Sequence, residues 1–516
     1  MKAFTEPLLS LAGFEEMTKT AEKSSGLISV TGCIDAQKSQ MIYAFGGHRK
    51  NKLIVTFGEQ KAKELYDEYS FFDKEVVYYP SKDVLFYQSD IRGNLLTAER
   101  IRALKAIREQ ERVTLVTTFD ALMNTMAPIE KMWENVLTLE QEQLLDLKEI
   151  QAALIRMGYE KEYQVQTMGQ FSVRGGILDV FPLTEENPIR IELWGDEIDT
   201  IRYFDCESQK SIENIEQVSI YPAAELVLSD EEKAGGIEKL KAEAKRVSDK
   251  LRKQMKTEEA HRVSEMADEL TEEWGELSMY AGMDAFLSYF FDERVGILDY
   301  FKPSDSLIFF DELTRCTEQG KLTETEFSES MKQRLAMGYI LPGQMNGLFT
   351  EKEIVAKLEK YSCIALAALD NKANGLHQLG SYGIHCQSVS PYNNSFELLI
   401  KDLKRYKKNG YRVILLSGSR TRAKRLSEDI TDQGITCFYT ENYDHELSQG
   451  QIMVCYGKVR RGFEYPILKF AVITESDIFG AQQKKKKRHR TYEGEKIQSF
   501  TDLSVGDYVV HENHGL

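Results

Sequence analysis

The chain has 516 residues, of which 42% are hydrophobic and 29% charged, and its formal net charge is −16. These values are typical of a globular protein with about three or four domains. The acidic balance argues against DNA binding as the main role of the chain, local patches excepted, because phosphate contacts require a basic field.

Targeting and redox features predict a cytoplasmic protein with no membrane partner. No apolar run reaches the roughly 18 residues that a membrane span requires, and no apolar core of a signal peptide follows Met1. The seven cysteines are scattered, and no two of them form a Cys-x-x-Cys pair. That pattern predicts reduced thiols and argues against a zinc site.

Residues 1–125 predict the first part of a parallel α/β domain. Short β-rich runs alternate there with helical patterns, and this alternation is typical of a parallel sheet with crossover helices. The expected strands are 27–30, 53–57, 76–79 and 113–116. The expected helices are 36–45, 59–69 and 95–107.

The first expected strand leads into a degenerate phosphate loop that runs from Gly32 to Ser39. The loop pattern is Gly-x-x-x-x-Gly-Lys-Ser, and Gln37 stands where the second glycine is required. That glycine lets the backbone approach phosphates in conformations that a side chain disfavours. We expect a strand-to-helix turn without a ligand. Because Lys38 and Ser39 remain, weak or remodelled nucleotide binding is the alternative.

Residues 126–219 predict a small α+β domain built on an antiparallel meander. Apolar-rich runs at 171–174 and 177–181 flank Gly175-Gly176, and two glycines between such runs are a strong hairpin signal. The next strand, 189–194, alternates with a period of two, and a return strand follows at 197–204. One face of the meander is therefore apolar, and the other carries Arg174, Arg190, Glu192 and Trp194.

A helix is expected at 141–157, before the meander. Its apolar positions share one face and are Leu144, Leu147, Ile150, Leu154 and Met157. Gly158 is expected to end the helix. We expect this helix to cover the apolar face of the meander and to leave the charged face exposed.

Residues 220–365 are expected to return the chain to the first domain, so that the meander is an insertion. The Glu- and Lys-rich stretch 229–275 spaces its apolar residues three and four apart, which predicts one long amphipathic helix. A coiled coil is not favoured, because about two heptads are too few. An apolar run then ends in Asp311-Glu312, like the magnesium-site strand that accompanies a phosphate loop. A buried strand with two exposed carboxylates is the simpler interpretation.

Residues 370–480 predict a further small α/β domain. Its expected strands are 412–416, 437–439, 452–455 and 470–474, and its expected helix is 421–431. No catalytic constellation stands out, and the histidines have no metal-ligand spacing.

The last two segments are a basic linker, 481–498, and a short tail, 499–516. The block 484–490 consists of lysines, arginines and one histidine. Such a block is normally a solvated linker, and contact with DNA or RNA phosphates is the alternative.

Several of these stretches carry a resemblance to two families. Val173 to Pro182, followed by Arg190 to Asp199, resembles the adaptor domain shared by excinuclease B and the transcription-repair coupling factors. The stretches 79–81, 99–100, 460–480 and 505–515 resemble the coupling-factor family. The last of them is similar to the opening of its polymerase-interacting module. The order of motifs fits that family's N-terminal half better than excinuclease B, which has an intact phosphate loop.

The resemblance implies a fold and a partner. The fold is α/β multidomain: a degenerate phosphate-loop NTPase-like sheet domain with an inserted α+β adaptor, a small α/β domain, and the truncated start of a β-barrel-like module. The adaptor is expected to bind excinuclease A through Arg174, Arg190 and Glu192. Ser172 stands where excinuclease B has a further arginine, so docking is expected to differ there. Reversing the charge of either arginine is expected to spare folding.

The resemblance also implies a function: recruitment of nucleotide excision repair to RNA polymerase stalled at DNA lesions. Polymerase contact is expected through 499–516. The ATP- and magnesium-dependent translocase motor, which makes most of the DNA contacts, is expected beyond this chain. No cofactor is expected on the chain itself. The alternatives are an active excinuclease B-like DNA-dependent ATPase or helicase, and an interaction scaffold unrelated to repair.

Overall fold

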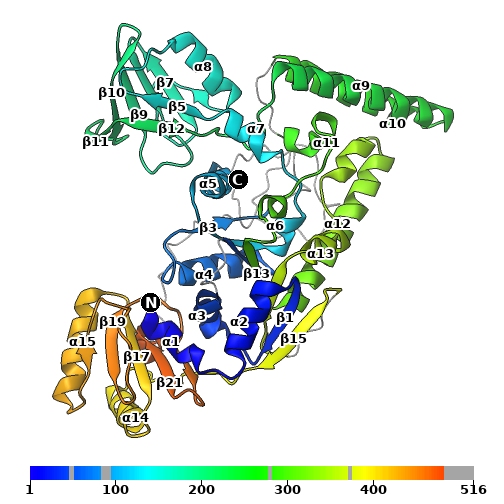
Figure 1. The fold of residues 1–516 in the computed structure, drawn as a ribbon. Coiled ribbons are helices and arrows are strands. Elements are labelled where there is room, and N and C mark those ends of the chain that lie inside the picture. Colours follow the sequence, from blue (N-terminus) through cyan, green and yellow to red (C-terminus); the bar gives the residue numbers. More distant parts are fainter. Residues whose placement is uncertain (46–50, 83–93, 277–281, 370–374, 481–516) are drawn as a thin grey trace, which may run out of the picture. The chain divides into compact units, whose positions relative to one another are not determined.

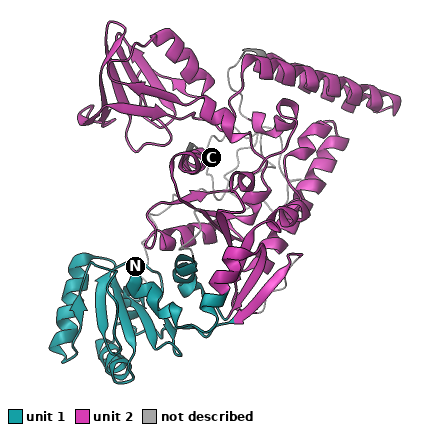
Figure 2. Cartoon of the chain, in the orientation of Figure 1, with its two compact units in different colours: residues 1–16, 32–45, 383–516 teal, residues 17–31, 46–382 magenta. Residues whose placement is uncertain are grey.

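The computed structural model describes residues 1–45, 51–82, 94–276, 282–369 and 375–480. It shows a mixed α/β protein with several sheets, as the sequence predicts. The chain divides into two compact units (Figure 2). The smaller unit comprises residues 1–16, 32–45 and 383–516, and the larger unit comprises 17–31 and 46–382. The predictions for 484–490 and 499–516 lie outside the described residues.

A seven-stranded sheet with the order β15-β1-β14-β13-β2-β4-β3 forms the centre of the larger unit (Figure 1). Strands β1, β14, β13, β2, β4 and β3 run parallel to their neighbours. Every residue of β13, β14 and β4 is buried, because strands inside such a sheet are covered on both faces. The strands are β1 (Gly26–Thr31), β2 (Asn51–Thr56), β3 (Val76–Tyr79), β4 (Val113–Thr118), β13 (Ser306–Asp311), β14 (Ser362–Leu366) and β15 (Gln378–Gly383).

Helices connect these strands as crossovers. The four strands expected in residues 1–125 are confirmed, and β13 confirms the run that ends at Asp311. Strands β14 and β15 have no counterpart in the sequence prediction. The longer helices are α2 (Phe14–Lys23), α4 (Glu59–Tyr69), α5 (Asn94–Glu109), α12 (Leu313–Ala336) and α13 (Glu351–Leu358). The short ones are α6 (Phe119–Met123), α7 (Ile129–Glu134), η1 (Met283–Phe286), α11 (Leu287–Phe290), η2 (Ile297–Tyr300) and η3 (Pro342–Asn346).

The adaptor meander is a six-stranded sheet with the order β11-β10-β9-β8-β7-β6, beside a two-stranded sheet of β12 and β5. The hairpin at Gly175-Gly176 is confirmed: Arg174 pairs with Ile177, and Gly175 has a φ of 61°. The strands are β5 (Leu137–Glu140), β6 (Glu160–Lys161), β7 (Gln170–Arg174), β8 (Ile177–Val180), β9 (Ile189–Trp194), β10 (Glu197–Phe204), β11 (Ser211–Ile215) and β12 (Gln217–Ile220).

Helix α8 (Leu147–Arg156) packs its apolar side on the meander, since Leu154 and Met157 belong to the same buried cluster as the strand residues Ile189 and Ile191. The helix is shorter than predicted. It begins after Asp146, whose carboxylate accepts a hydrogen bond from the amide of Lys148 at 2.7 Å. Leu144 lies outside the helix and is 75% exposed, so its predicted place on the apolar face is wrong.

Two helices, α9 (Asp230–Lys253) and α10 (Thr257–Glu276), occupy the stretch where the sequence predicts one. They form a hairpin, in which Ser248 donates to the carbonyl of Ala260 at 3.0 Å (Figure 1). The apolar seam of α9 is covered by a matching seam on α10, so the single-helix prediction is wrong. The buried seam residues are Leu240, Ala244, Leu251, Ala260, Val263, Ala267, Leu270 and Trp274. A Ser229–Glu232 capping box begins α9.

A second six-stranded sheet, with the order β16-β20-β21-β17-β19-β18, forms the core of the smaller unit. Its strands are β16 (Gln387–Ser388), β17 (Arg412–Ser417), β18 (Phe438–Tyr439), β19 (Ile452–Tyr456), β20 (Phe463–Tyr465) and β21 (Phe470–Thr474). The helices are α1 (Lys2–Leu9), α3 (Asp35–Phe45), α14 (Phe396–Lys408), α15 (Arg420–Asp432) and α16 (Glu475–Phe479). The strands and the helix expected between 412 and 474 are present, and α14 is additional.

Among the described residues, no helix is long and apolar enough to cross a membrane. The same part of the chain contains no group of three or more His, Cys, Asp or Glu side chains that could hold a metal ion.

Candidate functional site

The charged face of the adaptor meander brings together the three residues predicted to bind a partner. Arg174 ends β7, and Arg190 and Glu192 alternate along β9. Their backbones are in register through β8, where Asp179 pairs with Arg190 and Ile177 pairs with Glu192. One face of the meander therefore carries all three side chains, as the sequence predicts.

Asp179 holds both arginines. Its carboxylate accepts one hydrogen bond from Arg174 at 2.8 Å and two from Arg190 at 2.7 and 2.8 Å. Asp179 is 1% exposed, whereas the side chains of Arg174 and Arg190 are 36% and 13% exposed. The hydrogen bonds to Asp179 raise the pKa of Arg190. The buried carboxylate of Asp179 thus holds the guanidinium groups of both arginines in a fixed orientation.

Arg190 is also fixed from two other directions. Its guanidinium lies 4.4 Å from the centre of the Phe204 ring and donates to Gln209 Oε1 at 2.8 Å. The premise that Arg190 lies on an exposed face is therefore wrong, and charge reversal there is expected to destabilise the fold. A glutamate there would bring a second carboxylate against buried Asp179, and like charges in contact are costly to bury.

Glu192 has its own cationic partner, Arg202, on the neighbouring strand β10. Arg202 donates to both carboxylate oxygens of Glu192, at 2.9 Å to Oε2 and through a shorter contact to Oε1. These hydrogen bonds lower the pKa of Glu192. Because Arg202 lies directly opposite Arg190 in the sheet, Asp179 and Glu192 together neutralise two facing arginines.

Three further residues of this face were not predicted from the sequence as members of the site: Asp179, Arg202 and Trp194. Trp194 ends β9 and is 85% exposed, which is unusual for so large an apolar side chain. The alternation along 189–194 places Trp194 on the same face as Glu192. A tryptophan on that charged face was the feature of the sequence that could have marked it as a site residue. Asp179 had a weaker signal, a lone carboxylate inside an apolar strand.

Ser172 is buried, at 1% exposed, and donates its hydroxyl proton to the carbonyl of Tyr163 at 2.7 Å. The segment before β7 therefore covers the point where excinuclease B is expected to carry an arginine. A long charged side chain would displace this segment, which gives the departure at Ser172 a structural context.

The degenerate phosphate loop, in the smaller unit, is packed against its own chain. Gly32 has a φ of 78°, and a Cβ atom added there would lie 2.0 Å from the carbonyl oxygen of Ile384. Gln37, Lys38 and Ser39 are all at most 1% exposed. Tyr465 donates its hydroxyl proton to Gln37 Oε1 at 3.0 Å.

The two side chains that would contact a nucleotide in an intact loop, Lys38 and Ser39, are both buried, and Lys38 is paired within the protein. Lys38 Nζ pairs with Asp35 Oδ1 at 3.1 Å, and Ser39 Oγ is buried without a hydrogen-bond partner among the described residues. Phosphate binding needs open space above the loop for backbone amides to approach the anion. The backbone of Ile384 fills the space next to Gly32, so these residues do not fit a bound triphosphate.

The two carboxylates of the predicted magnesium-site strand belong to the larger unit. Asp311 is 2% exposed and accepts a hydrogen bond from Thr56 Oγ1 at 3.1 Å. Glu312 adopts a φ of 61° ahead of α12 and accepts a hydrogen bond from the amide of Ala368 at 3.1 Å. Both groups thus make contacts within the protein, and the interpretation of Asp311 as an exposed carboxylate is wrong.

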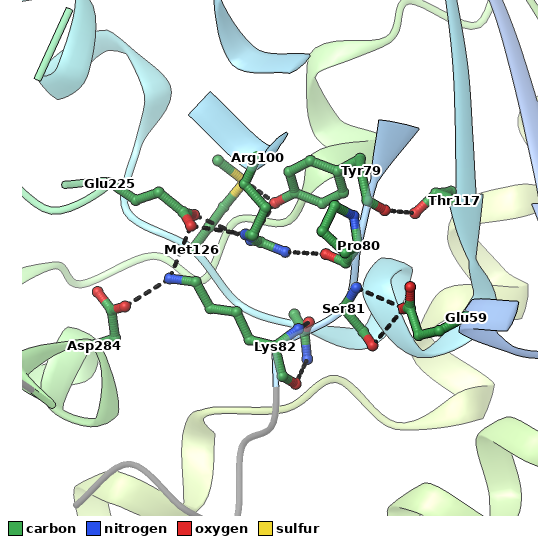
Figure 3. Close-up of polar contacts among 11 residues, drawn as sticks. Glu59, Tyr79, Pro80, Ser81, Lys82, Arg100, Thr117, Met126, Glu225 and Asp284 are labelled. Carbon is green, nitrogen blue, oxygen red and sulfur yellow. Dashed lines mark hydrogen bonds and ion pairs between the residues drawn. The ribbon is translucent and has the colours of Figure 1, made fainter. Parts of the chain in front are cut away.

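A buried ionic network ties the exit of the adaptor to the central sheet (Figure 3). Arg100, on α5, is fully buried and donates to both carboxylate oxygens of Glu225, at 2.7 and 3.0 Å. It also donates to the carbonyl of Pro80 at 2.6 Å. Lys82 Nζ joins Glu225 at 3.1 Å and Asp284 at 2.6 Å. Glu225 lies five residues after the end of β12, so this network fixes the chain where it leaves the adaptor.

Burial by itself would raise the pKa of Glu225, but the cations of Arg100 and Lys82 outweigh it and lower the pKa to about 2. Further contacts hold the adaptor on α5. Lys105 pairs with Glu185 at 3.0 Å, and the Tyr221 hydroxyl donates to Glu109 at 2.7 Å.

The geometry as a whole is that of an antiparallel meander on an α/β scaffold, with a charged face held by internal ion pairs and an exposed tryptophan. A comparison with known proteins finds a family match for this meander. Residues 137–226 match a family model described as the UvrB interaction domain.

Over most of its length the chain is similar to transcription-repair-coupling factors. It is 29% identical to that of Bacillus subtilis (strain 168) over 467 residues, which cover 90% of this chain and 39% of the relative. It is 28% identical to that of Staphylococcus haemolyticus (strain JCSC1435), covering 95% of this chain and 41% of the relative. The match to the Staphylococcus aureus (strain MRSA252) protein is also 28%, covering 98% and 42%.

The resemblance expected from the sequence is therefore confirmed. The chain spans about two fifths of the length of the curated relatives it matches.

Proposed function

We propose that this chain is the recruiting region of a transcription-repair coupling factor, and that its adaptor face binds excinuclease A. Recruitment would bring nucleotide excision repair to RNA polymerase stalled at a DNA lesion. In this proposal the ATP- and magnesium-dependent motor, which makes most of the DNA contacts, lies outside these 516 residues. Polymerase contact is assigned to 499–516, and the site of action is the cytoplasm.

The observation that carries the proposal is the adaptor face itself, in the stretch that matches the UvrB interaction domain. Two arginines are held on Asp179 with part of each side chain accessible, and Trp194 stands exposed at the end of the same strand as Arg190. Arginine and tryptophan are the residue types that most often dominate binding energy at interfaces. A planar guanidinium held in place also suits bidentate contact with a partner carboxylate.

The test is calorimetric binding of the full chain to excinuclease A. Trp194→Ala is expected to weaken binding about 30-fold, since truncating an interface anchor costs about 2 kcal/mol or more. Arg174→Ala is expected to weaken it about 10-fold, and it removes only one of the three hydrogen bonds that the arginines make to Asp179.

Leu398→Ala is the matched control, because Leu398 is also an exposed apolar side chain, 52% accessible, but lies in the smaller unit. It should bind like the parent. Equal affinity of the parent and Trp194→Ala would place the contact elsewhere. A folded parent with no affinity for excinuclease A would contradict the proposal and favour an unrelated scaffold.

The rival function, an excinuclease B-like ATPase, depends on a working phosphate loop. The contacts of Gly32 with Ile384 and of Gln37 with Tyr465 support the proposal that this chain binds no nucleotide. We expect ATP turnover at background level, with or without duplex DNA, and no change on Lys38→Ala. Robust turnover that Lys38→Ala abolishes would establish the rival function.

A further inference from the structure

We propose that the tip of the α9–α10 hairpin, residues 245–262, contacts the phosphate backbone of duplex DNA. This stretch holds seven lysines and arginines but only three carboxylates, in a chain whose formal net charge is −16. Phosphate neutralisation by clustered lysine and arginine is the main source of nonspecific DNA affinity. The tip is therefore a local basic field on an acidic protein.

Most of these cationic side chains are exposed and have no close ion-pair partner among the described residues. Six are exposed: Lys245, Arg246, Lys250, Arg252, Lys253 and Lys256. None of the four lysines among them forms an ion pair with a residue that the structure describes. The two arginines have only marginal partners, Arg246 with Glu243 at 3.9 Å and Arg252 with Asp249 at 4.0 Å. Exposed pairs at such distances contribute little, so the cations remain free to meet phosphates.

Helix-end electrostatics account for only part of this cluster. Lys250, Arg252 and Lys253 lie in the last turn of α9, where cations favour the carbonyl end of the helix. Lys245 lies further back on the helix, and Lys256 lies beyond the end of α9, next to α10. The carboxylates nearest to them in sequence are Glu243, Asp249, Glu258 and Glu259, and the last two lie in the first turn of α10.

The apex also presents an apolar contact. Met255, between the two helices, adopts a φ of 63° and is 88% exposed. Beside the first turns of α10, the Arg262 guanidinium lies 4.4 Å from the centre of the Tyr339 ring, and Tyr339 is 50% exposed. An apolar side chain among cations can reach the sugars or bases once the phosphates are held.

The choice of DNA over another polyanion rests on the proposed function, which places the chain at a DNA lesion. The binding measurement does not depend on excinuclease A. Loss of DNA contact and loss of excinuclease A binding are therefore separate outcomes.

The experiment is fluorescence anisotropy of a labelled 30-base-pair DNA duplex with the full chain at low salt. The tip variant is Lys253→Glu/Lys256→Glu, and the matched control is Lys239→Glu/Lys241→Glu. The control makes the same charge change on the same hairpin, about 18 Å further along α9. The pair of Lys239 with Asp292 is exposed, so the control should fold normally.

The tip variant is expected to bind at least 10-fold more weakly, and the slope of log K against log salt should fall by about 2. The control should stay within about twofold of the parent. A third variant replaces Lys484, Lys485, Lys486 and Lys487 with Gln. In that variant the tip substitutions should still weaken DNA binding.

Parent-like affinity of the tip variant would overturn the proposal. So would equal losses in the tip variant and the control, or binding that disappears only with the four-glutamine variant. Clearly tighter binding of a 30-base-pair RNA duplex would overturn the assignment to DNA.

Discussion

Replacing Arg100 with methionine is expected to lower the free energy of unfolding by about 3–5 kcal/mol, because it leaves the buried Glu225 carboxylate with too little compensation. Arg100 is fully buried, pairs with Glu225 at 2.7 Å and lies 4.0 Å from the centre of the Tyr79 ring. Lys82 remains as a second partner of Glu225, but it must also serve Asp284. Urea unfolding followed by circular dichroism measures the change.

Arg102→Met is the control for this prediction. Arg102 lies on the same helix, and the residue is only half-buried, so the same change should cost less than about 1 kcal/mol. The double variant Arg100→Met/Glu225→Gln should recover part of the loss, since the unpaired charge is gone. A cost below about 1 kcal/mol for Arg100→Met alone would show that the network contributes little.

The same network predicts a dependence of stability on pH. The pKa of Glu225 falls from 4.5 to about 2 in the folded chain, which corresponds to roughly 3 kcal/mol. Because the folded pKa is the lower one, this contribution is complete above pH 4.5 and is lost as the pH falls toward 2. In Glu225→Gln, the loss of unfolding free energy between pH 4.5 and about 2 should be smaller by roughly 3 kcal/mol. Identical acid profiles for parent and variant would contradict the assignment.

The second large effect is expected at Asp179. Asp179→Asn should lower the free energy of unfolding by about 2–4 kcal/mol, because two guanidinium groups lose their shared carboxylate. The lower end of that range reflects Arg174, whose side chain is 36% exposed and can turn to water. Thermal unfolding of the variant measures the change.

Binding to excinuclease A provides a second readout for Asp179→Asn, at a temperature where the variant is fully folded. We expect about 10-fold weaker binding, since the arginines are no longer held in one geometry. Asp199→Asn, an exposed carboxylate on β10, is the matched control and should change neither quantity. Unchanged affinity in folded Asp179→Asn would show that the partner does not depend on this orientation.

The sequence by itself determined the features that depend on neighbours along the chain. The alternation of strands and helices over 27–116 predicts a parallel sheet, and β1 to β4 follow it. Gly175-Gly176 predicts the hairpin because one of its residues must adopt positive φ. The period of two along 189–194 places Arg190 and Glu192 on one face. These signals are local, so a single sequence carries them in full.

Only the tertiary structure decided which distant groups meet. Glu225 reaches Arg100, and the backbone of Ile384 closes over Gly32, across long stretches of sequence that carry no periodic signal. The apolar seam of α9 is buried by α10. The spacing of its apolar residues does not indicate which element covers them. Asp179 became the support of the candidate site because strand register, not sequence separation, places a buried carboxylate beneath two arginines.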